Sequence, residues 1–197
     1  MIANGMHILP RGKIAAVVTY LEMTQPPPTK ALVSHKLEIK HVPQPDLEWY
    51  RALFRKVGEE WLWFSRLSIS DDQLKHIIHD PKVEIHVLQK EGKEVGLLEL
   101  NFCKEQECEL SYFGLIQSTI ATGAGRFLMQ AACKRAWSYA PTIQRFHVHT
   151  CTLDHPAAVG FYMRSGFKPY KRSVEITDDP RLDGRLSHQA AEWFPVV

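Results

Sequence analysis

The sequence predicts a mixed α/β (α+β) fold built on a largely antiparallel sheet. Apolar and polar side chains alternate from Val83 to Val87, and two further strand-like segments, 95–102 and 107–116, follow after short polar turns. A helical pattern of about four turns comes after the loop 117–125. A strand, a short helix and another strand complete this part of the chain. This order favours an antiparallel meander followed by strand–helix–strand units.

The first third of the chain predicts two strands and two helices. Segments 14–21 and 35–42 have strand character and flank the Pro-rich turn 26–28, which leaves open an irregular hairpin or two separate strands. Asp46 is the expected N-cap of a helix that runs to about Val57. The Ser70-Asp71-Asp72 sequence predicts the start of a second helix, which ends before Pro81.

The second half predicts a helix from the end of the 117–125 loop to the Ala140-Pro141 break, with apolar residues on one face. A strand is expected over 145–151. Asp154 is then the expected N-cap of a short helix that ends at Gly166, and a last strand is expected over 167–176.

Composition indicates one packed domain over residues 1–197, with 45% hydrophobic and 23% charged residues. A net charge of +2, with Lys and Arg spread along the chain, argues against nucleic acid as a partner. The apolar run 14–21 is too short to span a bilayer and lacks a signal-peptide cleavage pattern. We therefore expect a cytoplasmic protein with no membrane partner, whose four cysteines lack a CxxC pair and stay reduced.

The loop before the long helix is a candidate diphosphate site. A strand that leads through a glycine loop into a helix directs several backbone N–H groups and the helix dipole at one point. Gly123 and Gly125 permit close approach, Thr122 offers a hydroxyl and Arg126 a charge. No Gly-Lys-Ser/Thr follows, which excludes a Walker A motif. The alternative is that both glycines only shape the loop.

Three segments together resemble the GNAT N-acetyltransferase superfamily: 109–117 (ELSYFGLIQ), the Gly123-Ala-Gly125 loop, and 155–167 (HPAAVGFYMRSGF). The family's cofactor loop reads Gln/Arg-x-x-Gly-x-Gly/Ala, and its later signature contains an Asn, an Ala, a Tyr and a Gly-Phe pair. Ala158, Tyr162 and the Gly166-Phe167 pair fit this signature, as does Phe161. Ile120 stands where Gln or Arg is usual, and His155 where Asn is common.

This resemblance implies a GNAT core over 35–176, with an N-terminal strand and Pro-rich turn in 1–34 and a C-terminal tail in 177–197. It implies a strongly twisted, mostly antiparallel sheet with helices on both faces and a V-shaped split that holds acyl-CoA. The residues expected at acetyl-CoA are Leu115, Ile116 and Gln117 for the pantetheine arm, Thr122, Gly123, Ala124, Gly125 and Arg126 for the diphosphate, and His155.

The implied reaction is transfer of an acetyl group from acetyl-CoA to a primary amine by direct attack in a ternary complex. Glu109 is the candidate base that takes the ammonium proton, and Tyr162 is the candidate acid that protonates the departing thiolate. The alternatives are a solvent-facing strand carboxylate for Glu109 and a packed core tyrosine for Tyr162. At the level of the whole protein, the rival hypothesis is a non-catalytic module that binds acyl-CoA as a sensor or interaction domain.

The acceptor side is less specified. His147 and His149 share one strand face, and we expect no metal because no carboxylate lies close to them in sequence. Five aromatic residues either wall an acceptor pocket or pack in the core: Trp49, Tyr50, Trp61, Trp63 and Phe64. The acceptor is expected to be a small-molecule or peptide amine, and a homodimer is left open.

Overall fold

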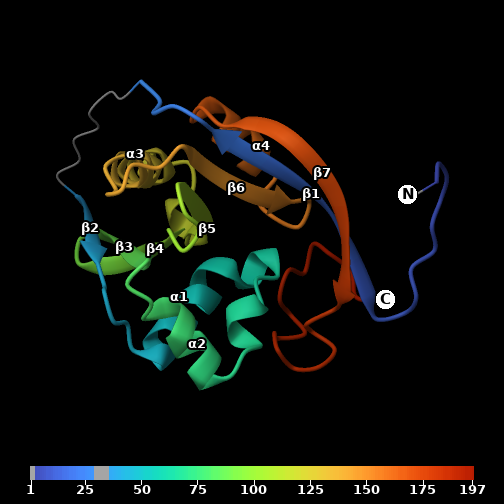
Figure 1. Cartoon of the computed structure of the whole chain (residues 1–197). Coiled ribbons are helices and arrows are strands. Elements are labelled where there is room, and N and C mark those ends of the chain that lie inside the picture. Colours follow the sequence, from blue (N-terminus) through green and yellow to red (C-terminus); the bar gives the residue numbers. More distant parts are fainter. Residues whose placement is uncertain (1–2, 29–35) are drawn as a thin grey trace.

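Seven strands form one sheet in the order β2-β3-β4-β5-β6-β1-β7 (Figure 1). The computed structural model describes residues 3–28 and 36–197. The strands are β1 (Lys13–Met23), β2 (Leu37–His41), β3 (Val83–Lys90), β4 (Lys93–Asn101), β5 (Glu107–Leu115), β6 (Arg145–Cys151) and β7 (Lys168–Asp178). The α-helices are α1 (Leu47–Gly58), α2 (Asp71–Ile78), α3 (Ala124–Trp137) and α4 (Ala158–Arg164). Three short 3-10 turns cover Glu59–Trp61, Ser65–Leu67 and Gln117–Thr119.

Both expected N-caps in the first third are confirmed. The Asp46 carboxylate accepts a hydrogen bond from the backbone N–H of Trp49 at 2.9 Å and begins α1. Ser70 begins α2 with a capping box, in which the Gln73 side chain accepts from the Ser70 N–H and the Ser70 hydroxyl accepts from the Gln73 N–H. These helices therefore start where local hydrogen bonds satisfy their first N–H groups.

The helices cover both faces of the sheet. Neighbouring residues of a strand point to opposite faces, so each inner strand can pack against helices on both sides. Val87 and Leu97 pack with Phe54 of α1 in a cluster that also holds buried residues of α2. On the other face, Leu88 and Leu98 belong to a second cluster built on α3, with Tyr162 of α4. β3 and β4 therefore carry buried apolar side chains on both faces.

The first two strands are separate and do not form a hairpin. β1 pairs antiparallel with β6 on one side and β7 on the other, while β2 pairs with β3 at the far edge. The first residue of the expected strand 35–42 lies outside the described residues. The meander β3-β4-β5 is confirmed, with antiparallel pairing at both steps.

The sheet splits between β5 and β6. These strands run parallel and pair at Glu107, Cys108 and Glu109, opposite Arg145, Phe146 and His147. Beyond this point β5 continues to Leu115 and β6 to Cys151 without pairing to each other. The register of β5 against β4 also shifts, since Leu110 faces Leu100 and Tyr112 faces Glu99, which leaves Ser111 as an extra residue. Such a bulge bends the strand and increases its twist.

The C-terminal tail packs against the first strand. Arg181 is 1% exposed and binds the Asp179 carboxylate with Nε and Nη2, while its Nη1 donates to the Phe194 carbonyl at 2.6 Å. The apolar residues Leu186 and Ala191 pack in a cluster with Ile14. The tail is therefore held in place by a buried ion pair and by a small core of its own. Among the described residues, no helix has the length and apolar character needed to cross a membrane.

Candidate active site

A cavity of about 930 Å³ occupies the split between β5 and β6. At one end it is lined by the start of α3 and by α4, including Gly123, Arg126 and Arg164. At the other end it reaches the turn segment 61–65, and it touches β1 at Ile14 and β7 at Glu175. A volume of this size is in the range of pockets that bind small molecules and cofactors.

The start of α3 offers unpaired backbone donors to this cavity. Gly123 is the N-cap residue, with φ of 91° and no side-chain capping bond, and the first bond of the helix runs from the Phe127 N–H to the Gly123 carbonyl. The N–H groups of Ala124, Gly125 and Arg126 therefore precede the hydrogen-bond ladder of the helix. A methyl group on Gly125 would contact Leu115 and Phe161 at 3.6 to 3.7 Å, so this glycine lies where β5, α3 and α4 meet.

The structure brings six of the eleven predicted site residues to the cavity wall. They are Leu115, Gly123, Gly125, Arg126, His155 and Tyr162. Ile116, Gln117, Thr122, Ala124 and Glu109 are not part of its lining. The Ile116 N–H donates to the Val95 carbonyl, and the Thr122 hydroxyl donates to the Thr119 carbonyl at 2.8 Å. These two groups are thus used to fix the loop.

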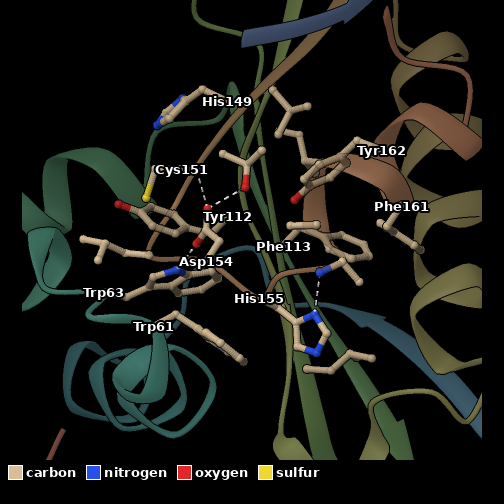
Figure 2. A pocket seen from close by; sticks show the side chains of 18 of the residues that line it. Trp61, Trp63, Tyr112, Phe113, His149, Cys151, Asp154, His155, Phe161 and Tyr162 are labelled. Carbon is tan, nitrogen blue, oxygen red and sulfur yellow. Dashed lines mark hydrogen bonds between the residues drawn. The ribbon is translucent and has the colours of Figure 1, made fainter. Parts of the chain in front are cut away.

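Tyr162 lies on α4 and is 7% exposed, with its ring among Phe113, Phe161 and Phe167. Its hydroxyl is directed into the cavity (Figure 2) and has no hydrogen-bond partner within the described part of the chain. Burial, and secondly the negative charge of Asp154, raise the pKa of this phenol well above its usual value. The hydroxyl therefore keeps its proton at neutral pH and can donate it.

Glu109 lies at the last position of β5 that pairs with β6, opposite His147. Its Oε1 is 3.8 Å from Nδ1 of His149, which does line the cavity. His147 is directed to Glu107 at 3.4 Å, and burial lowers the pKa of this histidine. Glu109 therefore reaches the cavity through His149, while His147 belongs to a neighbouring ion-pair group.

His155 precedes α4 and faces its own helix. Its Nδ1 accepts a hydrogen bond from the Ala157 N–H at 3.0 Å, and its ring packs edge-on against Trp61 with centroids 5.2 Å apart. The ring thus forms part of the cavity wall while one nitrogen is used locally (Figure 2).

The sequence profile of the Acetyltransferase (GNAT) family matches residues 47–167. The chain belongs to this family. The profile includes both walls of the split, the glycine loop and Tyr162, and the GNAT fold accounts for the mostly antiparallel sheet with its single parallel pair.

Solved GNAT structures share this fold at low sequence identity. A GCN5-related N-acetyltransferase from Sphaerobacter thermophilus matches with a TM-score of 0.60 and 15% identity, over 83% of this chain and 51% of the other. One from Kribbella flavida has a TM-score of 0.54 and 14% identity, over 88% and 63%. An aminoglycoside acetyltransferase from an uncultured soil metagenomic sample has a TM-score of 0.52 and 19% identity, over 66% and 87%.

The chain spans 63% of the length of the Kribbella flavida structure. It also spans 63% of a conserved protein of unknown function from Staphylococcus epidermidis, which matches over 85% of this chain with a TM-score of 0.55 and 14% identity. No curated protein sequence matches this chain. At identities this low the similarity shows a common fold, and fold alone does not fix the reaction.

The sequence predicted Asp154 as the N-cap of α4, and this prediction is wrong. The N-cap of α4 is Ala157, with no side-chain capping bond. The Asp154 carboxylate instead accepts from the Thr150 hydroxyl at 2.6 Å, the Cys151 N–H at 2.8 Å and the indole N–H of Trp63 at 3.2 Å. These bonds hold the Asp154 carboxylate at the turn after β6. There it lines the cavity and does not cap the helix.

Three of the five aromatic candidates line the cavity at the turn segment 61–65, namely Trp61, Trp63 and Phe64. Trp49 and Tyr50 do not. The Trp49 indole donates to Glu94, and the buried Tyr50 hydroxyl donates to the buried carboxylate of Glu99.

Tyr112 is a lining residue that the sequence did not single out. Its hydroxyl is hydrogen-bonded to the Ser65 hydroxyl, and the Arg66 guanidinium lies 5.0 Å from its ring centre. Arg66 in turn donates to Glu99 at 2.6 Å. A buried ion pair thus supports the aromatic wall at Tyr112.

One cluster of ligand-type atoms lies outside the cavity lining. Nitrogen and oxygen atoms of His41, Glu84 and His86 lie within 4.8 Å of one another. Arg135 donates two hydrogen bonds to the Glu84 carboxylate. Burial would raise the pKa of Glu84, but the hydrogen bonds from His86 and Arg135 outweigh it and lower the pKa to about 2. A guanidinium in this position is a partner for the carboxylate and opposes a cation there.

Proposed function

We propose that this GNAT chain transfers an acetyl group from acetyl-CoA to a primary amine by direct attack in a ternary complex. The observation that carries the proposal is a single cavity that runs from the unpaired N–H groups of α3 to the Tyr162 hydroxyl and on to an aromatic-walled end. Two substrates can therefore meet in one split of the sheet.

The α3 end of the cavity suits the diphosphate of CoA. The N–H groups of Gly125 and Arg126 precede the helix ladder, and the helix dipole adds positive potential there. Arg126 and Arg164 supply charge at this end. The pantetheine arm would then follow β5 past Leu115, whose side chain contributes to the same wall.

The reaction needs two proton transfers, for which the cavity offers the Tyr162 hydroxyl and, next to its lining residue His149, the Glu109 carboxylate. The amine nitrogen attacks the thioester carbonyl carbon and the C–S bond breaks. The departing thiolate takes the proton of the Tyr162 hydroxyl, which burial keeps protonated. The proton lost by the amine passes to Glu109, which is joined to the cavity through His149. Holding amine and thioester together in this split supplies a further part of the rate.

A thiol-release assay tests the proposal. The whole chain is mixed with acetyl-CoA and a panel of primary amines, free thiol is measured, and CoA binding is measured separately by calorimetry. Amine-dependent thiol release supports acetyl transfer. Binding of CoA without thiol release from any amine supports a non-catalytic acyl-CoA module instead, and absence of CoA binding contradicts both functions.

A further inference from the structure

Asp154 has one hydrogen-bonding position left, and the cavity lies in front of it. An ionised carboxylate can accept about four hydrogen bonds, two on each oxygen. Oδ2 already accepts from the Thr150 hydroxyl and the Cys151 N–H, while Oδ1 accepts only from the Trp63 indole. One lone pair of Oδ1 therefore has no partner within the described residues, and Asp154 contributes to the cavity wall.

The position of Asp154 is central to the reaction site. Figure 2 shows it between two groups of side chains, with Trp61, Trp63 and Tyr112 on one side and Phe113, Phe161 and Tyr162 on the other. The charge of Asp154 also contributes to the raised pKa of the Tyr162 phenol. A group bound at Oδ1 is thus placed between the aromatic wall and the proposed acid.

Charges are divided along the cavity lining. The two arginines that line it, Arg126 and Arg164, come from α3 and α4 at the proposed cofactor end. Away from this end the acidic lining residues are Asp154, beside the aromatic wall, and Glu175 of β7. Among the described lining residues no arginine or lysine lies near Asp154 and Glu175, so an anionic acceptor would meet the like charge of these two carboxylates.

We propose that Asp154 binds the acceptor as its ammonium ion, and that the acceptor is an amine with a flat, apolar body that packs on Trp61 and Trp63. This rests on the proposed acetyl transfer and names the substrate class for that site. A simple aliphatic amine is an ammonium at neutral pH, with a pKa near the ~10.4 of lysine. Its N–H donates to Oδ1 of Asp154, while the indole and phenol rings favour a cation and an apolar body close to their faces.

The three existing donors serve this role. They hold the carboxylate in one orientation, with the open position of Oδ1 beside the aromatic wall. The Trp63 indole also fixes the aromatic wall relative to the anion, because the same bond joins the two. The ammonium is thus received by a preorganised group.

The test compares three ligands of one shape on the whole chain saturated with CoA. They are 2-phenylethylamine, 2-phenylethanol, which lacks the charge, and L-phenylalanine, which adds a carboxylate. Calorimetry is expected to show the amine binding about tenfold or more tighter than either analogue, in line with a charge-assisted hydrogen bond. In Asp154→Asn the amine is expected to lose about tenfold or more in affinity, while phenylethanol and CoA stay within about twofold.

Each outcome decides the inference. Equal losses for the amine and the alcohol in Asp154→Asn would show that Asp154 only maintains the turn and the Trp63 position. If that variant does not fold, the wild-type ligand series still decides, since equal or tighter binding of L-phenylalanine overturns the proposal. Glu175→Gln, at an exposed position, is expected to weaken the amine by less than Asp154→Asn does. If the proposed acetyl transfer itself is wrong, the result is instead the absence of CoA binding or of thiol release with every amine.

Discussion

Replacing Gly123 with alanine separates the cofactor role of the glycine loop from its role in stability. Gly123 has φ of 91°, and a Cβ built there meets no atom within 4 Å. The cost of an alanine is therefore backbone strain alone, about 1–2 kcal/mol. Loss of unfolded-state entropy offsets about 0.4–1 kcal/mol of it. A net loss of about 1 kcal/mol lowers the Tm by about 2–4 °C in a domain of this size.

The chain contains a matched control. Gly92, in the turn between β3 and β4, has φ of 76° and also meets no atom within 4 Å when a Cβ is added. Gly92→Ala should lower the Tm of the CoA-free protein by a similar amount. Gly92 lies outside the cavity lining, so it should leave CoA binding unchanged.

The difference between the two variants appears when CoA is added. At about 100 times its Kd, CoA stabilises the wild type and Gly92→Ala by about 2.7 kcal/mol. Relaxation of the strained N-cap turns the donors of α3 away from the diphosphate, and the loss of one charge-assisted hydrogen bond weakens binding about tenfold. The same CoA concentration then stabilises Gly123→Ala by only about 1.4 kcal/mol.

The assay is thermal unfolding of the three proteins with and without CoA at fixed concentrations, with Kd measured by calorimetry. A Gly123→Ala protein that keeps the full CoA-dependent rise in Tm would refute the placement of the diphosphate at α3. A smaller rise in both variants would point to a general effect of strain on the fold.

Three further results are expected. Gly125→Glu places a carboxylate where the methyl group of an alanine would already contact Leu115. Calorimetry should show CoA binding weakened by about tenfold or more. Unchanged CoA affinity would contradict the site. Tyr162→Phe should lower kcat about 10²-fold or more in the thiol assay and leave the Kd for CoA unchanged, and full turnover would exclude Tyr162 as the acid. The pKa of Glu84 is lowered from 4.5 to about 2, so its ionised form contributes about 3 kcal/mol to the free energy of unfolding. This stability is present above pH 4.5 and is lost as the pH falls toward 2. Urea unfolding of Glu84→Gln should therefore show lower stability at neutral pH and a flatter profile between pH 4.5 and 2, and a profile equal to that of the wild type would refute it.

The sequence predicted those parts of the fold that depend on neighbours in the chain. The caps at Asp46 and Ser70 act on N–H groups three residues away, so their pattern is visible in a short window. The β3-β4-β5 meander follows from alternation and short turns in the same way. The glycine loop before α3 was found because backbone donors at a helix start need few specific side chains.

Long-range pairings were not predictable from local patterns. The position of β1 between β6 and β7 depends on partners more than 120 residues away. Asp154 has the pattern of an N-cap, yet one of its bonds comes from Trp63, 91 residues earlier. Tyr112 is a wall residue beside the bulge at Ser111, where the register of β5 against β4 shifts.

The two halves of the cavity differ in their relation to the GNAT profile, which matches residues 47–167. The proposed cofactor half, from Gly123 to Tyr162, lies wholly inside this region. The acceptor half also uses Ile14 and Ala16 of β1 and Glu175 and Thr177 of β7, which lie outside it. The docked tail packs against Ile14 and supports this end. The proposed cofactor half therefore rests on segments shared with the family, whereas the acceptor half also depends on β1 and β7, which lie outside the matched region.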